Sequence, residues 1–198
     1  MLFLPGVPLF AQESSTASGT QTYTSPDGRF QLSYPDWFTR CSYQNDSWGS
    51  CTSYMPMCGA VWQTEPDTPI CVAYPPDKVP AESNFLGAAF SVSEINGVTS
   101  QADCEAFAPN PAGVGAKQRV KEINGQKFTW ISMGGAAMGH YQDARAYRTF
   151  HGDRCFELDV VLNYRSGTGY DEVPLKQFDS APVKKLLGDT LESFRFVK

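Results

Sequence analysis

A hairpin signal at Gly152-Asp153 constrains this sequence more than any other feature. Runs rich in aromatic and β-branched residues flank the pair over residues 144–164, and a glycine at the first loop position suits a two-residue type II′ turn. Pairing the two runs across this loop places Arg148 opposite Glu157, a favourable cross-strand charge pair. One face of the second run becomes a hydrophobic row made of Phe156, Leu158, Val160 and Leu162. The sequence therefore predicts that this hairpin lies in the middle of a β-sheet.

Further strand patterns occur at residues 23–35, 88–95 and 119–133. The last of these predicts a second hairpin, because Asn124-Gly125 is the typical sequence of a type I′ turn. Residues 133–139, rich in glycine and alanine, are interpreted as a linker between the two hairpins.

Helical patterns occur twice. Ser100 and Asp103 match a capping box before a short helix. Asp179 or Ser180 can cap a longer helix, whose apolar residues recur at helical spacing: Val183, Leu186, Leu187, Leu191 and Phe194. Gly188 inside this helix weakens it by about 1 kcal/mol relative to alanine.

The composition is that of a folded, acidic domain. The 198 residues suffice for one domain with a substantial core, and 41% hydrophobic and 13% aromatic residues argue against disorder. The net charge of −5 and the pI near 5.0 argue against a dedicated nucleic-acid binder, because phosphate binding needs a basic face. No stretch is long and apolar enough to predict a membrane-spanning helix, and no motif predicts a cofactor.

The N-terminal segment is interpreted as a leader. Residues 1–11 resemble the back half of a secretory signal peptide that ends in an imperfect small-residue cleavage site at Ala11. The basic region that begins such a peptide is missing, so we expect the true start to lie upstream; the alternative is an apolar tail or a segment that docks on the fold. The predicted organisation is a leader over residues 1–21 and a single domain over 22–198, in a periplasmic or secreted protein.

The cysteines favour disulfide bonds. They are Cys41, Cys51, Cys58, Cys71, Cys104 and Cys155. An even number of cysteines behind a segment that resembles a signal peptide is typical of an oxidising compartment. The spacing pairs Cys104 with Cys155 and leaves the connectivity of the first four open. A zinc site is the alternative, but Cys51 and Cys58 are too far apart for the usual zinc knuckle and no histidine lies near them.

Residues 41–80 are predicted to be a disulfide-stapled insertion in this domain. The segment has little periodicity and many proline, glycine, serine and asparagine residues, and a loop of this length is uncommon in a compact domain. Its aromatic side chains either pack as a small satellite core or form a recognition face. Candidates for such a face are Trp48, Tyr54 and Trp62.

The two ends of the chain resemble PsbP-like domains. The segment SPDGRFQLSYPDWF, residues 25–38, resembles their opening hairpin, and LLGDTLESFRF, residues 186–196, resembles their closing helix and strand. The resemblance implies an α+β fold, a single PsbP-like α/β/α sandwich with a central antiparallel sheet, to which this chain adds the cysteine-rich insertion. It also implies a binding or assembly role, since these domains share no catalytic motif.

Three functional hypotheses follow. The first is a secreted or periplasmic non-catalytic binding module whose partner is an unknown envelope or extracellular protein. The second is a hydrolase in which Asp143 orients His140 as a general base. The third is an envelope copper-handling protein, because the thioethers of Met55 and Met57 and the thiolate of Cys58 are soft ligands that suit Cu(I).

Overall fold

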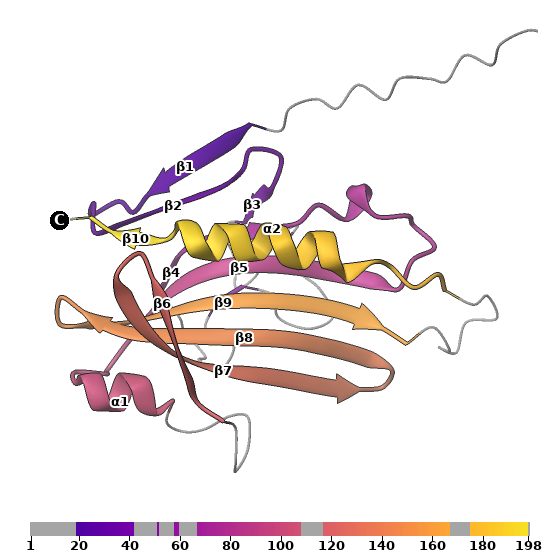
Figure 1. Ribbon diagram of the computed structural model, residues 1–198. Coiled ribbons are helices and arrows are strands. Elements are labelled where there is room, and N and C mark those ends of the chain that lie inside the picture. Colours follow the sequence, from indigo (N-terminus) through magenta and orange to yellow (C-terminus); the bar gives the residue numbers. More distant parts are fainter. Residues whose placement is uncertain are drawn as a thin grey trace, which may run out of the picture.

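Antiparallel β-strands make up most of the described chain (Figure 1). The computed structural model describes residues 19–41, 51, 58–59, 67–107, 117–166 and 175–197. The strands are β1 Thr20–Thr24, β2 Phe30–Pro35, β3 Thr39–Cys41, β4 Asp67–Ala73, β5 Phe85–Ile95, β6 Arg119–Ile123, β7 Gln126–Ala137, β8 His140–His151, β9 Arg154–Arg165 and β10 Arg195–Phe196. The helices are α1 Gln101–Ala106, α2 Ser180–Ser193 and a short 3-10 helix, Pro76–Lys78. None of the described helices is long and apolar enough to cross a membrane.

The predicted hairpin forms β8 and β9 and lies in the middle of the larger sheet. This sheet has seven strands in the order β3-β4-β5-β9-β8-β7-β6. The register is the predicted one, with Arg148 opposite Glu157. The predicted turn type is wrong: Gly152 and Asp153 have φ angles of 56° and 63°, and two positive values define a type I′ turn. Aspartate tolerates this left-handed conformation better than most residues do.

The predicted linker at residues 133–139 is instead part of a strand. β7 continues through it and pairs with β8 from Met133 opposite Ala144 onward. Met138 and Gly139, with φ angles of 51° and 80°, form the turn between β7 and β8. This pair is not a usual hairpin-turn sequence, so the turn was not predicted. Because β7 is long, β7, β8 and β9 form a continuous antiparallel meander, which aligns side chains across all three strands.

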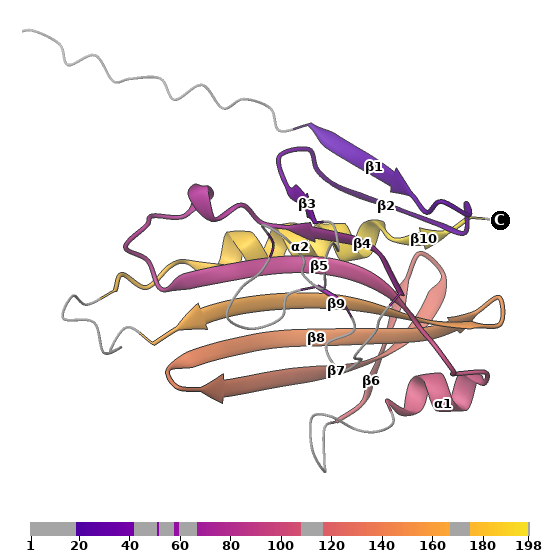
Figure 2. The same ribbon diagram turned by 180° about the vertical axis from the view of Figure 1, so that it is seen from behind.

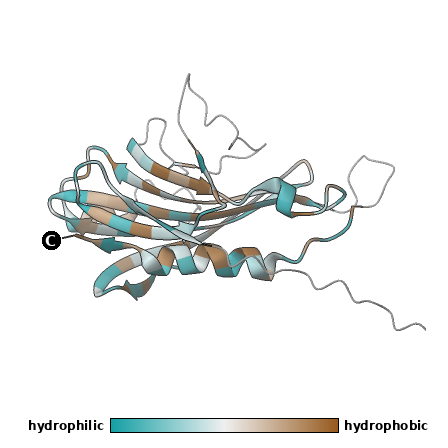
Figure 3. Ribbon diagram, turned by 90° about the horizontal axis from the view of Figure 1, so that it is seen from above, coloured by the Kyte–Doolittle hydropathy of each residue, from teal (hydrophilic) through white to brown (hydrophobic). Residues whose placement is uncertain are grey.

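One face of the large sheet, here called the α2 face, carries the main core. Helix α2 crosses β5 and β9 on this side, beside a small sheet of order β1-β2-β10 (Figures 1 and 2). Hydrophobic and hydrophilic residues alternate along α2 (Figure 3), as expected for a helix with one buried side. Buried residues of this core include Leu32, Phe90, Phe156, Leu158, Leu162, Val183, Leu187 and Leu191.

The two segments that resemble PsbP-like domains meet in the small sheet. Strand β10 pairs with β2, with Phe196 opposite Phe30. The end of α2 is joined to β2 by Ser193, whose Oγ donates to the Ser33 carbonyl at 2.9 Å and accepts from the Ser33 amide at 2.8 Å. Strand β1 begins at Thr20, slightly before the predicted domain boundary at residue 22; the rest of the predicted leader, residues 1–18, lies outside the described residues.

The Asn124-Gly125 turn between β6 and β7 also holds the end of α2. Asn124 and Gly125 have φ angles of 48° and 81°, so the predicted type I′ turn is confirmed. The Asn124 amide nitrogen donates to the carbonyls of Glu192 and Phe194, both at 2.8 Å. The last carbonyls of a helix lack partners within it. This one side chain therefore fixes α2 over the β6–β7 hairpin.

The opposite face, the α1 face, is less helical than the predicted sandwich requires. Helix α1 spans six residues and covers one end of β8 and β9 (Figure 2). The Cys104–Cys155 disulfide attaches it to β9, with Cα atoms 5.5 Å apart. The fold therefore contains more β-structure than the expected α/β/α sandwich. On the α1 face the helix is short, and on the α2 face the helix shares its layer with the small sheet β1-β2-β10.

Two further disulfides anchor the cysteine-rich insertion on the same face. They join Cys41 to Cys51 and Cys58 to Cys71. Cys41 and Cys71 are directly opposite each other on β3 and β4, so both bonds start from one position of the sheet. These bonds settle the connectivity that the cysteine spacing left open.

A buried ionic cluster lies on the α1 face of β8 and β9. Arg148 forms an ion pair with Glu157, and its guanidinium carbon lies 4.5 Å from the centroid of the Phe107 ring. Asp159, next on this face of β9, is fully buried. Burial, followed by the negative charge of Glu157, raises the pKa of Asp159 well above 3.8. Asp159 therefore retains its proton more strongly than an exposed aspartate.

The contact between Asn124 and α2 gives the first testable prediction. Asn124→Gly keeps the left-handed turn but removes both hydrogen bonds to the helix, so the free energy of unfolding should fall by roughly 1–3 kcal/mol. Asn124→Asp should cost at least as much, because it places a carboxylate beside carbonyls at the negative end of the helix. Urea unfolding measures both; a glycine variant as stable as the wild type would show that the contact does not hold α2.

The buried cluster gives a second prediction, on pH dependence. Because the folded-state pKa of Asp159 is raised above the unfolded value of about 3.8, its contribution to stability is complete below that pH and is lost as the pH rises toward the folded pKa. Asparagine does not titrate. The unfolding free energy of Asp159→Asn, relative to wild type, should therefore be more favourable at about pH 7 than at about pH 4. If the difference in unfolding free energy between Asp159→Asn and wild type is the same at both pH values, the pKa of Asp159 is not raised in the folded protein.

Candidate binding groove

The structure separates the two residues considered for acid–base chemistry. His140 and Asp143 both lie on β8, but strand residues an odd number apart point to opposite faces of a sheet. Asp143 lies on the α2 face, where its Oδ2 accepts a hydrogen bond of 2.8 Å from Lys184 Nζ. His140 lies on the α1 face. The predicted pair is therefore not formed, and the hydrolase alternative loses the arrangement on which it rested.

The structure also removes the thiolate from the predicted copper site. Cys58 is bonded to Cys71, so its sulfur is not a free thiolate. The sulfurs of Cys41, Cys58 and Cys71 lie within 4.8 Å of one another, but all three are in disulfides. Met55 and Met57 lie outside the described residues. The same holds for the aromatic residues considered as a recognition face, Trp48, Tyr54 and Trp62.

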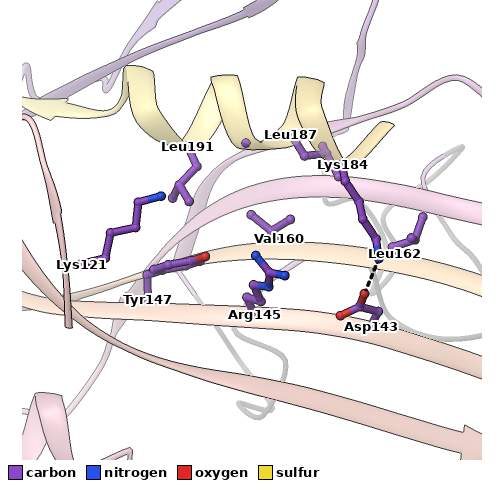
Figure 4. A pocket seen from close by; sticks show the side chains of 10 residues that line it. Lys121, Asp143, Arg145, Tyr147, Val160, Leu162, Lys184, Leu187 and Leu191 are labelled. Carbon is purple, nitrogen blue, oxygen red and sulfur yellow. Dashed lines mark hydrogen bonds and ion pairs between the residues drawn. The ribbon is translucent and has the colours of Figure 1, made fainter. Parts of the chain in front are cut away.

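A small groove opens on the α2 face, between α2 and strands β8 and β9 (Figure 4). Its volume is about 100 Å³. Its lining consists of Lys121, Asp143, Arg145, Tyr147, Val160, Leu162, Lys184, Leu187, Gly188 and Leu191. Asp143, Arg145 and Tyr147 point from β8 toward the helix, because alternate residues of a strand share a face.

The floor of the groove is apolar. Val160 and Leu162 come from β9, and Leu187 and Leu191 come from the side of α2 that faces the sheet. The two leucines are four residues apart and therefore lie one above the other along the helix. Three of the four side chains are buried and Val160 is half-buried, so the floor is an extension of the main core toward solvent.

An aromatic and cationic wall stands beside this floor. The strand register places Arg119 opposite Trp130, and Trp130 opposite Tyr147. The Trp130 and Tyr147 rings stack with centroids 5.6 Å apart. The guanidinium carbons of Arg119 and Arg145 lie 5.1 and 5.8 Å from the centroid of Trp130, within the range of cation–π attraction.

The charges around the groove are only partly balanced. Lys121 pairs with Glu192, and Lys184 pairs with Asp143 at 2.8 Å. Within the described part of the chain, neither arginine beside Trp130 has a carboxylate within 4.0 Å. Four cations therefore face two carboxylates, and the rim carries an excess of positive charge on a protein whose net charge is −5.

Part of this site was within reach of sequence reasoning. The register of the Asn124-Gly125 hairpin begins with Ile123 opposite Gln126 and, four residues further from the turn, places Arg119 opposite Trp130. The addition of Tyr147 and Arg145 depends on the pairing of β7 with β8. That pairing could not be expected, because residues 133–139 lack the strand pattern and Met138-Gly139 is not a usual hairpin sequence. Lys184 belongs to the site only because α2 packs on this face of the sheet, where the lysine reaches Asp143 of β8.

Comparison with known proteins extends to the fold alone. No protein-family model matches the sequence, and no curated protein matches it significantly. The fold is shared with a protein from Bacteroides thetaiotaomicron, at a TM-score of 0.51 and 12% identity, over 89% of this chain and 48% of that one; the chain thus spans about half the length of that relative. Cyanobacterial PsbP (CyanoP) from Synechocystis matches at a TM-score of 0.44 and 13% identity, over 96% of this chain and all of that one.

Proposed function

We propose that this protein is a non-catalytic binding module, periplasmic or secreted, that binds an anionic partner in the groove between α2 and β8. The observation that carries the proposal is the pair of arginines, Arg119 and Arg145, beside Trp130 without a carboxylate partner in the described chain. Exposed arginine and aromatic side chains are enriched at the energetic centres of protein interfaces. An excess of positive charge on an acidic protein favours an anionic partner at this place.

Three disulfide bonds support the location. They join all six cysteines of the chain. Disulfides persist in the periplasm and outside the cell but are rare in the reducing cytosol. The signal-peptide-like segment at residues 1–11 favours the same compartment.

The chemistry of the groove supports binding over catalysis. The described residues that line it include no serine, cysteine or histidine. Its one carboxylate, Asp143, is engaged by Lys184. Histidine is the commonest general base, and serine and cysteine are common nucleophiles. Lysine and tyrosine can also act in these roles, but Lys121 and Lys184 both pair with carboxylates, and Tyr147 is buried and stacked on Trp130. The groove therefore offers positioning charges and apolar surface, which suit recognition.

We further infer a relationship to PsbP-like domains from the two end segments. They resemble the opening and closing motifs of that family, and their strands pair in the small sheet, with Arg195 opposite Gln31 and Phe196 opposite Phe30. The two segments are distant in sequence but form one small sheet. Their joint occurrence is therefore more specific to the PsbP-like pattern than either motif alone. A binding or assembly role is in keeping with this relationship.

Gly188 keeps the groove open. It lies in the interior of α2 and lines the groove, and a Cβ atom added there would meet no atom within 4 Å. Glycine in a helix interior costs about 0.5–1 kcal/mol relative to alanine. Packing in the described chain gives no reason for this cost, whereas an open groove does.

Substitution of Gly188 is therefore expected to separate stability from binding. Gly188→Ala should raise the free energy of unfolding by roughly 0.5–1 kcal/mol, because it restores helix propensity without a clash. Gly188→Leu should preserve the fold and fill the mouth of the groove. Urea unfolding measures the first effect, and far-UV circular dichroism verifies the second. If Gly188→Ala destabilises the protein, the space beside Gly188 is not open.

Affinity capture tests the proposed function directly. The tagged protein is used to retrieve partners from envelope and extracellular fractions of the producing cells. Arg145→Glu should reduce recovery of the specific partner at least about tenfold, equivalent to a loss of about 1.4 kcal/mol, because it reverses a charge at the groove rim.

Lys185→Glu is the matched control for this capture. It makes the same change of charge on the neighbouring helix α2, at a side chain that is 74% exposed and pairs with Asp189 outside the groove. Recovery with this variant should equal that of the wild type. Equal losses with Arg145→Glu and Lys185→Glu, or no loss with either, would show that the partner does not bind in the groove.

A further inference from the structure

We infer that the groove recognises an acidic protein segment with a single aliphatic side chain, which enters the groove while neighbouring carboxylates pair with Arg119 and Arg145. This inference rests on the proposed function and adds the chemical class of the partner. It follows from the size of the groove, the division of its surface into floor and rim, and the shape of the cationic surface.

The size of the groove excludes a ligand that is enclosed as a whole. Sites that bury a drug-sized metabolite or cofactor have volumes of roughly 300–1,000 Å³, whereas this groove measures about 100 Å³. An apolar cavity of about 150 Å³ holds one benzene molecule. The groove therefore accepts a group the size of one aliphatic side chain, and the remainder of the ligand lies outside it. Such a pocket is the usual receptor for an anchoring residue of a larger partner.

The floor and rim define what that anchor and its neighbours must be. The floor offers only aliphatic contacts, from Val160, Leu162, Leu187 and Leu191. A polar anchor would lose its hydrogen bonds to water without replacement there. Arg145 lines the groove, and Arg119 lies beside it against the same Trp130 ring. The fork geometry of both guanidinium groups matches carboxylates. In a segment with an aliphatic residue between aspartates or glutamates, the aliphatic side chain contacts the floor and the carboxylates pair with the arginines.

The charged surface fits a protein segment better than a membrane or a nucleic acid. A nucleic acid presents a continuous row of phosphates and needs an extended basic face, whereas the cations here gather around one small groove on a protein whose net charge is −5. Binding to anionic lipid relies on apolar side chains that project into the bilayer from a basic surface. Here the apolar residues are recessed between α2 and β9 (Figure 4), and the cations surround a depression. A short segment of chain can enter such a depression, and a lipid headgroup layer cannot.

The test uses short synthetic peptides and methyl-labelled protein. The first probe is acetyl-Glu-Asp-Leu-Asp-Glu-amide; the second replaces its leucine by serine, and the third replaces its acidic residues by lysine. NMR titration should show shifts of the Val160 and Leu187 methyl groups with the first peptide. The serine peptide should bind at least about tenfold more weakly, since burial of a leucine side chain is worth about 1.5–3 kcal/mol. The lysine peptide should not bind.

Variants and other anions complete the test. Gly188→Leu should abolish the methyl shifts, and Lys185→Glu should leave them unchanged. The inference is overturned if the leucine peptide produces no shifts in the groove, if the serine peptide binds as well, or if sodium hexanoate or phosphatidylserine vesicles bind there more tightly. Self-association that Gly188→Leu removes would also overturn it, since the occupant would then be a second copy of this chain.

The two levels of the proposal can fail separately. If capture depends on Arg145 but the peptides do not bind, the groove remains the binding site and only the ligand class is wrong. If the captured partner is indifferent to Arg145→Glu, the proposed function itself is wrong.

Discussion

The pairing of β8 with β9 is the constraint on which the rest of the structure depends. Its register directs Leu158 and Leu162 toward α2, and Glu157 and Asp159 toward the opposite face. A shift of one residue would exchange these two sets. Carboxylates would then enter the main core, and the floor of the groove would face α1. The type I′ turn at Gly152 joins the strands with a twist that matches their own and so supports this single register.

The two faces of the sheet are stabilised in different ways. On the α2 face, aromatic and aliphatic side chains from the large sheet, the small sheet and α2 form one continuous core. On the α1 face, the ion pair of Arg148 with Glu157 and the acid Asp159 are buried with fewer hydrophobic residues around them. Burial of charge costs free energy that pairing only partly returns. The three disulfides all lie on this face, where cross-links offset the weaker hydrophobic contribution.

The sequence predicts local pairing well and the assembly of distant parts poorly. Turns with a physical signature, Gly152-Asp153 and Asn124-Gly125, set both hairpin registers, and the periodicity of α2 identifies its buried side. Two local predictions were wrong: the type of the Gly152-Asp153 turn and the linker at residues 133–139. The linker was predicted because small residues have little strand preference, whereas β7 is stabilised there by pairing with β8. The sandwich implied by family resemblance was too helical, since α1 proved to be short.

The groove belongs to the part that sequence alone does not reveal. The residues that line it come from β6, β8, β9 and α2, and only their packing brings Arg145 and Lys184 near an apolar floor. His140 and Asp143 are close in sequence, but their spacing of three residues on a strand places the two side chains on opposite faces of the sheet. The groove thus exists only because the helix packs on this face of the meander.

Site-specific photocrosslinking tests the central claim most directly. Ser132 is exposed on β7 opposite Arg145, at the edge of the groove, and Lys185 lies on the outer side of α2. A photoreactive amino acid is introduced at either position, and the protein is irradiated in envelope and extracellular fractions. We expect a cross-link from position 132 to an acidic segment of one partner, and none to that partner from position 185. Equal cross-linking from both positions, or cross-linking from 185 alone, would contradict the groove as the binding site.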